Sequence, residues 1–314
     1  MDFLKLDNPP KDLETPIMLF AFEGWADAAE SATHALRYLI RRLKATKFAE
    51  IDPEEFYNFA RVRPFTKFDD DGNRYIEWPA NEFYFHKGEG DQQDVIIFVG
   101  VEPNLRWRTF SELLVGVVKD LGVSKAIHVG ALLDAVPHTR SSRVSGTATS
   151  PELRGTVNGL RVRRSRYTGP AGITTAVTEV MKAQGIPTMS LWGHTPHYLQ
   201  VSPNPKVSRE LIQGLQRLLN IEVDLEPLKS QGKNFERRVD QALADEPEVV
   251  AYVEKLEAQW DSGHEGPPEE SMPDGEGSEG TEDIEMPEPG QAVQGIEEFL
   301  RQAREARDSE DKKN

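Results

Sequence analysis

Charged and aromatic side chains follow three separate apolar runs of the chain, in each case just after the run ends. Side chains of these types could bind an anion, exchange a proton or contact a partner. They are Glu23, Trp25, Asp27, Glu102, Arg106, Arg108, His138 and Arg140. In an α/β sheet, side chains beyond the carboxyl ends of the strands line the ligand crevice. We therefore expect the three loops to meet at one crevice or one interface.

The first loop leaves two interpretations open. Asp27 precedes a run with helical spacing, so its carboxylate could simply cap the start of a helix. Gly24 permits an unusual backbone angle. The neighbouring Glu23 and Trp25 lie at a strand end, where an acid and an indole suit a ligand or a partner.

The second and third loops combine opposite charges. Arg106 and Arg108 stand near a predicted helix start, where a cation opposes the helix dipole, so they suggest a carboxylate or anion partner. Glu102 is the obvious internal partner, in a structural pair with Arg106. His138 and Arg140 could bind a phosphate or carboxylate, with the histidine as proton donor.

His194 and His197 follow a further apolar run and are three residues apart. That spacing could suit a metal, but no third ligand stands close, and we expect neither a metal nor a cofactor. The loop from Tyr167 to Ile173 could hold an anion at a helix start, yet it lacks the P-loop and dinucleotide patterns. No nucleophile elbow, Ser-His-Asp signature or paired-carboxylate motif stands out.

The segments that must position these residues alternate between strand and helix. Short apolar runs predict strands, and apolar residues three and four positions apart predict helices. The predicted strands are Ile17–Phe22, Val95–Val99, Lys125–Val129 and Pro187–Trp192, and the predicted helices are Asp27–Leu43, Thr109–Leu121 and Ile173–Gln184. This alternation implies an α/β fold, with a largely parallel sheet and helices on both faces. Separately, Asp71-Gly72 predicts a hairpin over Phe65–Trp78.

The chain changes character after residue 204, where the predicted α/β domain of residues 1–204 ends. Residues 205–260 predict a helical appendage of three helices, Val207–Leu219, Phe235–Ala244 and Glu248–Trp260. Residues 261–290 hold 11 acidic and no basic residues, and such a segment buries too little apolar surface to order itself. Residues 291–307 regain helical spacing. We expect a tethered amphipathic helix that docks on its own body or on a partner.

Composition restricts the class of protein further. The 314 residues are 38% hydrophobic and include no cysteine, and no window approaches the roughly 20 apolar residues of a membrane span. Without a signal pattern at Met1–Lys5, we expect a cytoplasmic protein with no membrane partner. The net charge is −16, of which residues 261–290 contribute −11, so the rest carries only −5 and nucleic-acid binding is not expected. The exception is the basic run Arg161–Arg166, which an acidic partner or the acidic tail could contact.

Taken as a set, six short motifs resemble the bacterial branch of the proteasome assembly chaperone family, of the type of the second eukaryotic assembly chaperone. The resemblance covers roughly residues 15–260. The motifs are Gly24–Ala28, Gly100–Arg108, Val136–Arg140, Tyr167–Gly172, Gly193–Tyr198 and Pro203–Lys206.

The resemblance implies a phosphorylase/hydrolase-like three-layer α/β/α sandwich with a small C-terminal helical part. It also implies an assembly-chaperone or scaffold role and self-association, for which Trp78, Phe83 and Phe85 are candidate exposed aromatics. Archaeal members dock on proteasome rings through a hydrophobic-tyrosine tail. The last residues here, Asp311–Asn314, depart from that pattern, so we do not expect docking through them.

Two functions therefore stay open. The first is a non-catalytic protein-binding or assembly factor with a proteasome-related partner, present as a homo-oligomer. The second is an enzyme, phosphorylase/hydrolase-like or ligase-like, that acts on a small anionic or nucleoside-like substrate in the strand-end crevice. A phosphorylase-like fold invites this interpretation but does not by itself establish activity.

Overall fold

Four parallel strands form the centre of the structure, in the spatial order β7-β2-β8-β12. They are β2 (Ile17–Glu23), β7 (Val95–Val101), β8 (Lys125–Asp134) and β12 (Thr188–Pro196). The computed structural model describes residues 3–148, 151–157, 160–164, 168–199 and 201–262. Every residue of β2 except Glu23 is buried, as continuous apolar runs in a sheet covered on both faces require.

Shorter strands extend this centre on both sides into a ten-stranded sheet. On the β7 side lie β6 (Glu82–His86), β3 (Thr46–Ile51) and β1 (Leu4–Leu6), each antiparallel to its neighbour. On the β12 side lie β9 (Val144–Ala148), β11 (Leu160–Arg163) and β10 (Gly155–Val157). Residues 165–166 of the predicted basic run lie outside the described residues.

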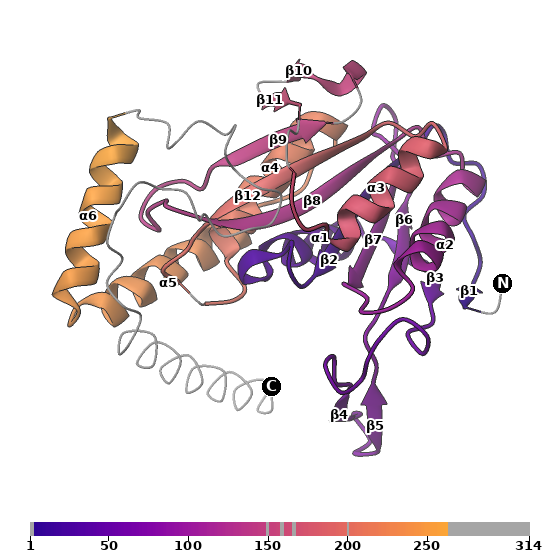
Figure 1. Cartoon of the computed structure of the whole chain (residues 1–314), viewed down its shortest axis with the longest axis horizontal. Coiled ribbons are helices and arrows are strands. Elements are labelled where there is room, and N and C mark those ends of the chain that lie inside the picture. The colour runs from indigo at the N-terminus through magenta and orange to yellow at the C-terminus, as the bar shows by residue number, and fades with distance from the viewer. Residues whose placement is uncertain (1–2, 149–150, 158–159, 165–167, 200, 263–314) are drawn as a thin grey trace.

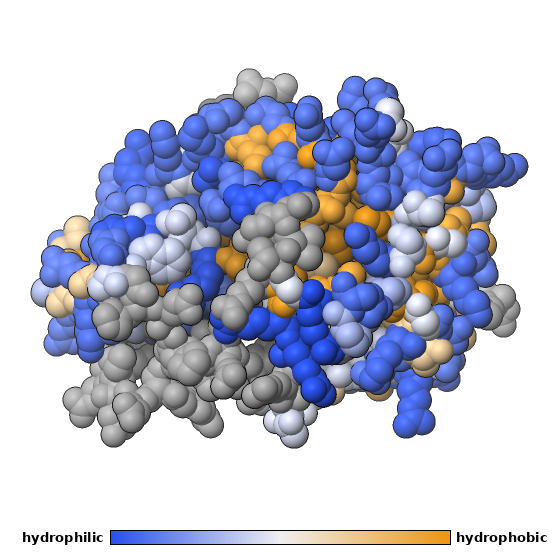
Figure 2. All heavy atoms as spheres, turned by 90° about the horizontal axis from the view of Figure 1, so that it is seen from above, coloured by the Kyte–Doolittle hydropathy of each residue, from blue (hydrophilic) through white to orange (hydrophobic). Residues whose placement is uncertain are grey.

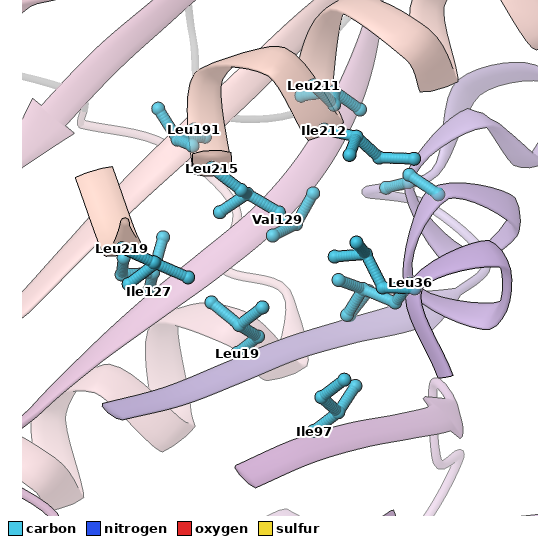
Figure 3. Close-up of a cluster of buried hydrophobic side chains, with 14 of the residues drawn as sticks. Leu19, Leu36, Ile97, Ile127, Val129, Leu191, Leu211, Ile212, Leu215 and Leu219 are labelled. Atoms are coloured by element: carbon cyan, nitrogen blue, oxygen red, sulfur yellow. The ribbon is translucent and has the colours of Figure 1, made fainter. Parts of the chain in front are cut away.

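Helices cover both faces of the sheet, which confirms the predicted α/β/α sandwich. Helices α1 (Ser31–Arg42) and α4 (Pro205–Leu219) pack on one face. Figure 3 shows their leucine and isoleucine side chains meeting those of the central strands in one cluster. Helices α2 (Trp107–Asp120) and α3 (Ile173–Ala183) cover the other face, together with a layer of phenylalanines from β2, β6 and β7.

Two further helices, α5 (Glu226–Leu243) and α6 (Pro247–Asp261), lie at the end of the molecule remote from the N-terminus (Figure 1). They form a small apolar cluster of their own with Leu199. The helix α4, by contrast, packs into the main core through Val207, Leu211 and Leu215. The predicted linker 261–290 lies almost wholly outside the described residues, and the predicted helix 291–307 lies entirely outside them.

The predicted hairpin consists of β4 (Phe65–Phe68) and β5 (Arg74–Glu77), which pair only with each other and project from the sheet in Figure 1. The aromatic residues after it were expected on the surface, and for Phe83 this expectation is wrong. Phe83 is 0% exposed because it lies in β6, where it packs on Phe48 and Phe98. Phe85 is half-buried against Phe48, whereas Trp78 is exposed.

Three predicted boundaries fall short of the observed elements. The strand β8 continues five residues past the predicted end at Val129, and β12 continues past Trp192 to Pro196. The helix α5 begins at Glu226 rather than Phe235. The β12 and α5 extensions are rich in polar residues, so apolar periodicity ends before these elements do. The β8 extension begins at Gly130, where the predicted apolar run ends.

We predict that Gly193→Ala destabilises the protein, because β12 and α4 touch at this residue. A Cβ atom there would lie 2.5 Å from Cγ1 of Val207, so one of the two elements must shift. We expect the free energy of unfolding to fall by about 1–3 kcal/mol, measured by urea denaturation.

The matched control is Gly214→Ala in α4, whose added Cβ would meet no atom closer than 3.8 Å. Helix propensity should make that variant neutral or more stable by up to about 1 kcal/mol. Equal effects of the two substitutions would contradict the close contact.

Candidate functional site

A pocket of about 710 Å³ opens at the carboxyl ends of β2 and β7. Its walls combine two indoles, two prolines and three charged side chains. The lining residues are Glu23, Gly24, Trp25, Arg61, Val101, Glu102, Pro103, Asn104, Trp107, Pro170 and Ala171. A volume of this size falls within the usual range for ligand pockets. Of the predicted residues, the pocket therefore brings together Glu23, Trp25 and Glu102.

Glu102 joins three segments at the floor of this pocket. One carboxylate oxygen accepts a hydrogen bond from the backbone N–H of Ile173 (3.0 Å), at the start of α3, and the other accepts one from the N–H of Trp25 (3.4 Å). Both Gly24 and Gly172 approach the Glu102 side chain so closely that a Cβ atom on either would be crowded against it. The carboxylate thus occupies the positive end of the α3 dipole.

The predicted Glu102–Arg106 pair does not form. The guanidinium of Arg106 instead pairs with Glu55 (3.0 Å), and Glu102 is used by backbone amides. Glu23 also has an ionic partner, Arg37 of α1. Arg108 lies exposed in the first turn of α2. Partners from distant segments of the sequence therefore replace the local pair that spacing suggested.

Asp27 caps the helix α1, one of the two roles considered for it. Its carboxylate accepts hydrogen bonds from the N–H groups of Ala32 (2.7 Å) and Thr33 and from the Thr33 hydroxyl. Asp27 is only 5% exposed. Burial raises its pKa to about 6, against the lowering effect of these hydrogen bonds.

His138 and Arg140 lie away from the pocket, against the C-terminal helices. The imidazole of His138 is buried, with Nδ1 2.8 Å from the Tyr198 hydroxyl and Nε2 3.0 Å from Oδ1 of Asp240 in α5. Burial lowers the pKa of His138, so the neutral ring donates from Nε2 to Asp240 and accepts from Tyr198. Arg140 forms ion pairs with Glu257 (3.2 Å) and Asp261 (2.7 Å) of α6.

His194 and His197 also have partners within the chain. His197 contacts the backbone oxygen of Asp134 (3.0 Å) and the Tyr252 hydroxyl of α6 (3.2 Å). His194 lies between the Asp134 carboxylate and the Ser145 hydroxyl. Both histidines thus contact Asp134, one at its backbone oxygen and the other at its carboxylate. In the described part of the chain, no three His, Cys, Asp or Glu side chains form a group that could hold a metal.

Most of the predicted site residues thus fall into two groups: those that line the pocket, and those against α5, α6 or β9. Asp27, Arg106 and Arg108 belong to neither group. Sequence reasoning missed Arg61 and Trp107 of the pocket and Ser145 beside His194. No local signal pointed to Arg61, since it comes from a loop distant in sequence. Trp107 does stand within the quoted motif Gly100–Arg108, and its position one residue after Arg106 was the available signal.

An exposed apolar surface lies on the β4–β5 hairpin, which follows in sequence the loop that carries Arg61. We use the name hairpin surface for the exposed large apolar residues of β4, β5 and the residue that follows them: Phe65, Phe68, Tyr75, Ile76 and Trp78. Register places Phe65 and Tyr75 on one face of the hairpin and Phe68 and Ile76 on the other. Figure 2 shows apolar areas set into a mostly hydrophilic surface on the face that it views.

The loop that carries Arg61 connects this hairpin surface to the pocket. Phe59 contacts Trp78 with ring centroids 4.8 Å apart. The backbone oxygen of Phe56 accepts hydrogen bonds from the N–H groups of Asn104 (2.9 Å) and Leu105 (3.0 Å). Asn104 lines the pocket. Contiguous exposed apolar patches on a protein surface often mark interaction sites.

The strand order and helix placement define a doubly wound α/β/α protein with a pocket at the carboxyl edge of its parallel strands. The chain belongs to the PAC2 family, whose model matches residues 21–243.

Solved structures agree with that assignment. A PAC2 family protein from Streptomyces avermitilis is 37% identical, with 76% of this chain and 99% of that chain covered and a TM-score of 0.68. A proteasome-assembly chaperone homologue from Mycobacterium tuberculosis is 36% identical over 76% and 99% of the two chains, with a TM-score of 0.67. An archaeal proteasome activator from Pyrococcus furiosus shares the fold at 20% identity, covering 77% and 99%, with a TM-score of 0.62.

We predict that Asp27 makes stability depend on pH. With a pKa of about 6 in the folded protein and 3.8 as its ordinary value, the folded state holds more protons than the unfolded state between these pH values. The free energy of unfolding should therefore fall as pH rises from about 4 to about 6, by up to about 3 kcal/mol.

The check compares urea denaturation of the native protein and Asp27→Asn across this pH range. Because asparagine does not titrate, the stability of the native protein relative to the variant should decline as pH rises. A difference that stays constant with pH would show that Asp27 keeps its ordinary pKa.

We predict that Glu257→Gln loosens α6, because Glu257 contacts both Thr139 and Arg140. Hydrogen exchange of the α6 amides should accelerate about two- to fivefold, the effect of losing one partly exposed ion pair. The control Glu254→Gln lies on the exposed side of the same helix and should leave exchange unchanged. Equal rates in the two variants would mean that the loop does not hold α6.

Proposed function

We propose that this PAC2 family protein is a protein-binding assembly factor with a proteasome-related partner. The observation that carries the proposal is its similarity to the proteasome-assembly chaperone homologue of Mycobacterium tuberculosis, which extends over nearly all of that protein. The family match over the α/β body supports the same role. The partner is a protein rather than a nucleic acid or a membrane, and the protein acts in the cytoplasm. No described helix is long and apolar enough to cross a bilayer.

The chemistry of the pocket supports binding over turnover of a small anion there. Glu23 is paired with Arg37, and Glu102 already occupies the start of α3, where an anionic substrate would otherwise bind. His138 and Arg140, which were candidates for acid catalysis and anion binding, hold α5 and α6 instead. The pocket therefore offers an apolar cavity with one further charged wall, Arg61, to a protein partner.

The hairpin surface supports self-association as well as partner binding. An isolated two-stranded hairpin is marginally stable in water, and this one exposes apolar side chains on both faces. Contact with a second copy, or with an assembling subunit, would cover those side chains. We propose that the protein is a homo-oligomer for this reason and through its family resemblance.

We predict that the tagged full-length chain co-purifies with free proteasome α or β subunits and that, alone, it has the mass of an oligomer. Replacing Phe68 and Ile76 by serine removes the apolar side chains of one hairpin face. This double variant should weaken binding about tenfold or more, as loss of an interface anchor does. Size-exclusion chromatography with light scattering measures the mass of the protein alone and its co-elution with proteasome subunits.

The control Val250→Ser removes an exposed apolar side chain of α6, outside the hairpin, and should behave like the native protein. Circular dichroism establishes that each variant is folded. A monomer that co-elutes with no proteasome subunit at high micromolar concentration would refute the proposal.

A further inference from the structure

Ser145, His194 and Asp134 form a continuous hydrogen-bonded chain at the β12 side of the sheet. The Ser145 hydroxyl lies 2.9 Å from Nε2 of His194, and Nδ1 of His194 lies 2.8 Å from Oδ2 of Asp134. Both distances fall within the range for a nucleophile, its base and the group that orients the base. Each ring nitrogen of His194 therefore has one partner, in the order that acyl-transferring serine enzymes use.

The fold brings these three residues together from distant positions in the sequence. Parallel pairing places Asp134 beside Pro196 at the end of β8, two residues from His194 along β12. Antiparallel pairing places Ser145 of β9 opposite Trp192, two residues from His194 on the same face of the strand. Such a set is recognised by its geometry and not by a sequence motif, which is why no signature announced it.

Hydrogen bonds and a neighbouring charge favour the ionised form of Asp134, which this arrangement needs. His194 is 0% exposed, and the Asp134 side chain is 12% exposed. Burial works against ionisation of Asp134, but the hydrogen bonds from His194 and from the Ala135 N–H, together with the charge of Arg143, hold its pKa below the ordinary value. The carboxylate thus accepts from Nδ1–H, which leaves Nε2 as the acceptor for the serine proton. Ser145 is half-buried, whereas the His194 ring beside it is buried.

We propose that Ser145 is a nucleophile activated by His194 and oriented through Asp134, able to take an acyl group from a small carboxylic ester. This activity goes beyond the proposed assembly role and uses a site separate from the β2–β7 pocket. The Ser145 oxygen bonds to the carbonyl carbon while its proton passes to Nε2 of His194. The C–O bond of the ester then breaks, and the departing alcohol takes that proton. Water hydrolyses the acyl-serine by the same path and releases the carboxylic acid.

The first test uses an alkyl fluorophosphonate, which forms a P–O bond to an activated serine as fluoride leaves. Mass spectrometry of the full-length protein should show one adduct, located at Ser145 and absent in Ser145→Ala. His194→Gln and Asp134→Asn should slow labelling about a hundredfold or more, as the loss of a base or its orienting group does. Thermal melting establishes that these variants remain folded.

The matched control is Ser190→Ala, because Ser190 is a half-buried serine of β12 whose hydroxyl has no histidine partner among the described residues. It should label like the native protein. The second test is a burst of about one equivalent of p-nitrophenolate per chain from p-nitrophenyl acetate, lost in Ser145→Ala.

Two results would overturn the proposal. One is the absence of an adduct at Ser145 after hours with millimolar reagent. The other is equal labelling of the native protein and His194→Gln, which would make the hydrogen-bonded chain merely structural. Co-purification of Ser145→Ala with proteasome subunits tests the assembly role separately, so either conclusion can fail without the other.

Discussion

The parallel register between β8 and β12 determines what lies beyond the carboxyl edge of the sheet. These strands pair from Ala126–Thr188 to Asp134–Pro196, whereas the ladder of β2 with β8 ends at Phe20–His128. The pair therefore runs past β2 as a two-stranded extension. The loops that follow the two strands contact α5 and α6, through His138 and His197. The sequence suggests that the ends of the four central strands are equivalent, but β8 and β12 end farther along the strand direction than β2 does. This difference separates the histidines from Glu23 and Glu102.

At the carboxyl ends of β2 and β7, Glu102 determines how the neighbouring segments are arranged. One carboxylate connects the end of β7 to the first turn of α3 and to the loop after β2. A carboxylate at a helix start satisfies backbone donors that no side-chain cap serves here, since the α3 N-cap is Gly172. The same contacts fix Trp25 against Gly172 and so shape one wall of the pocket. A residue that the sequence placed among the candidates for the crevice is therefore the structural anchor of one wall of the pocket.

The sequence predicts a feature well where the pattern that indicates it is local, and poorly where the feature depends on residues distant in sequence. Runs such as Ile17–Phe22 and the hairpin turn at Asp71-Gly72 are local, and both appear where they were predicted. The short strands β9 to β11 carry no comparable run and were missed. The strand ends were correctly identified as the place of polar clusters, but Arg37, Glu55 and Ser145 reach those clusters from other elements. The spacing of residues along the chain does not show which partners come from other elements. The sequence alone could therefore not decide whether Glu102 pairs with Arg106.

Stability and recognition are assigned to different parts of this molecule. The sandwich buries its apolar residues in two continuous clusters, one on each face of the sheet. The β4–β5 hairpin contributes to neither and is held by local contacts, among them the Lys67–Glu77 pair (2.7 Å) and the bonds of Asp69 within its turn. Surface pairs of this kind stabilise by only about 0–1 kcal/mol. Exposed aromatic side chains on so lightly held an element add nothing to the core. Their presence is therefore best explained by a surface that covers them on binding.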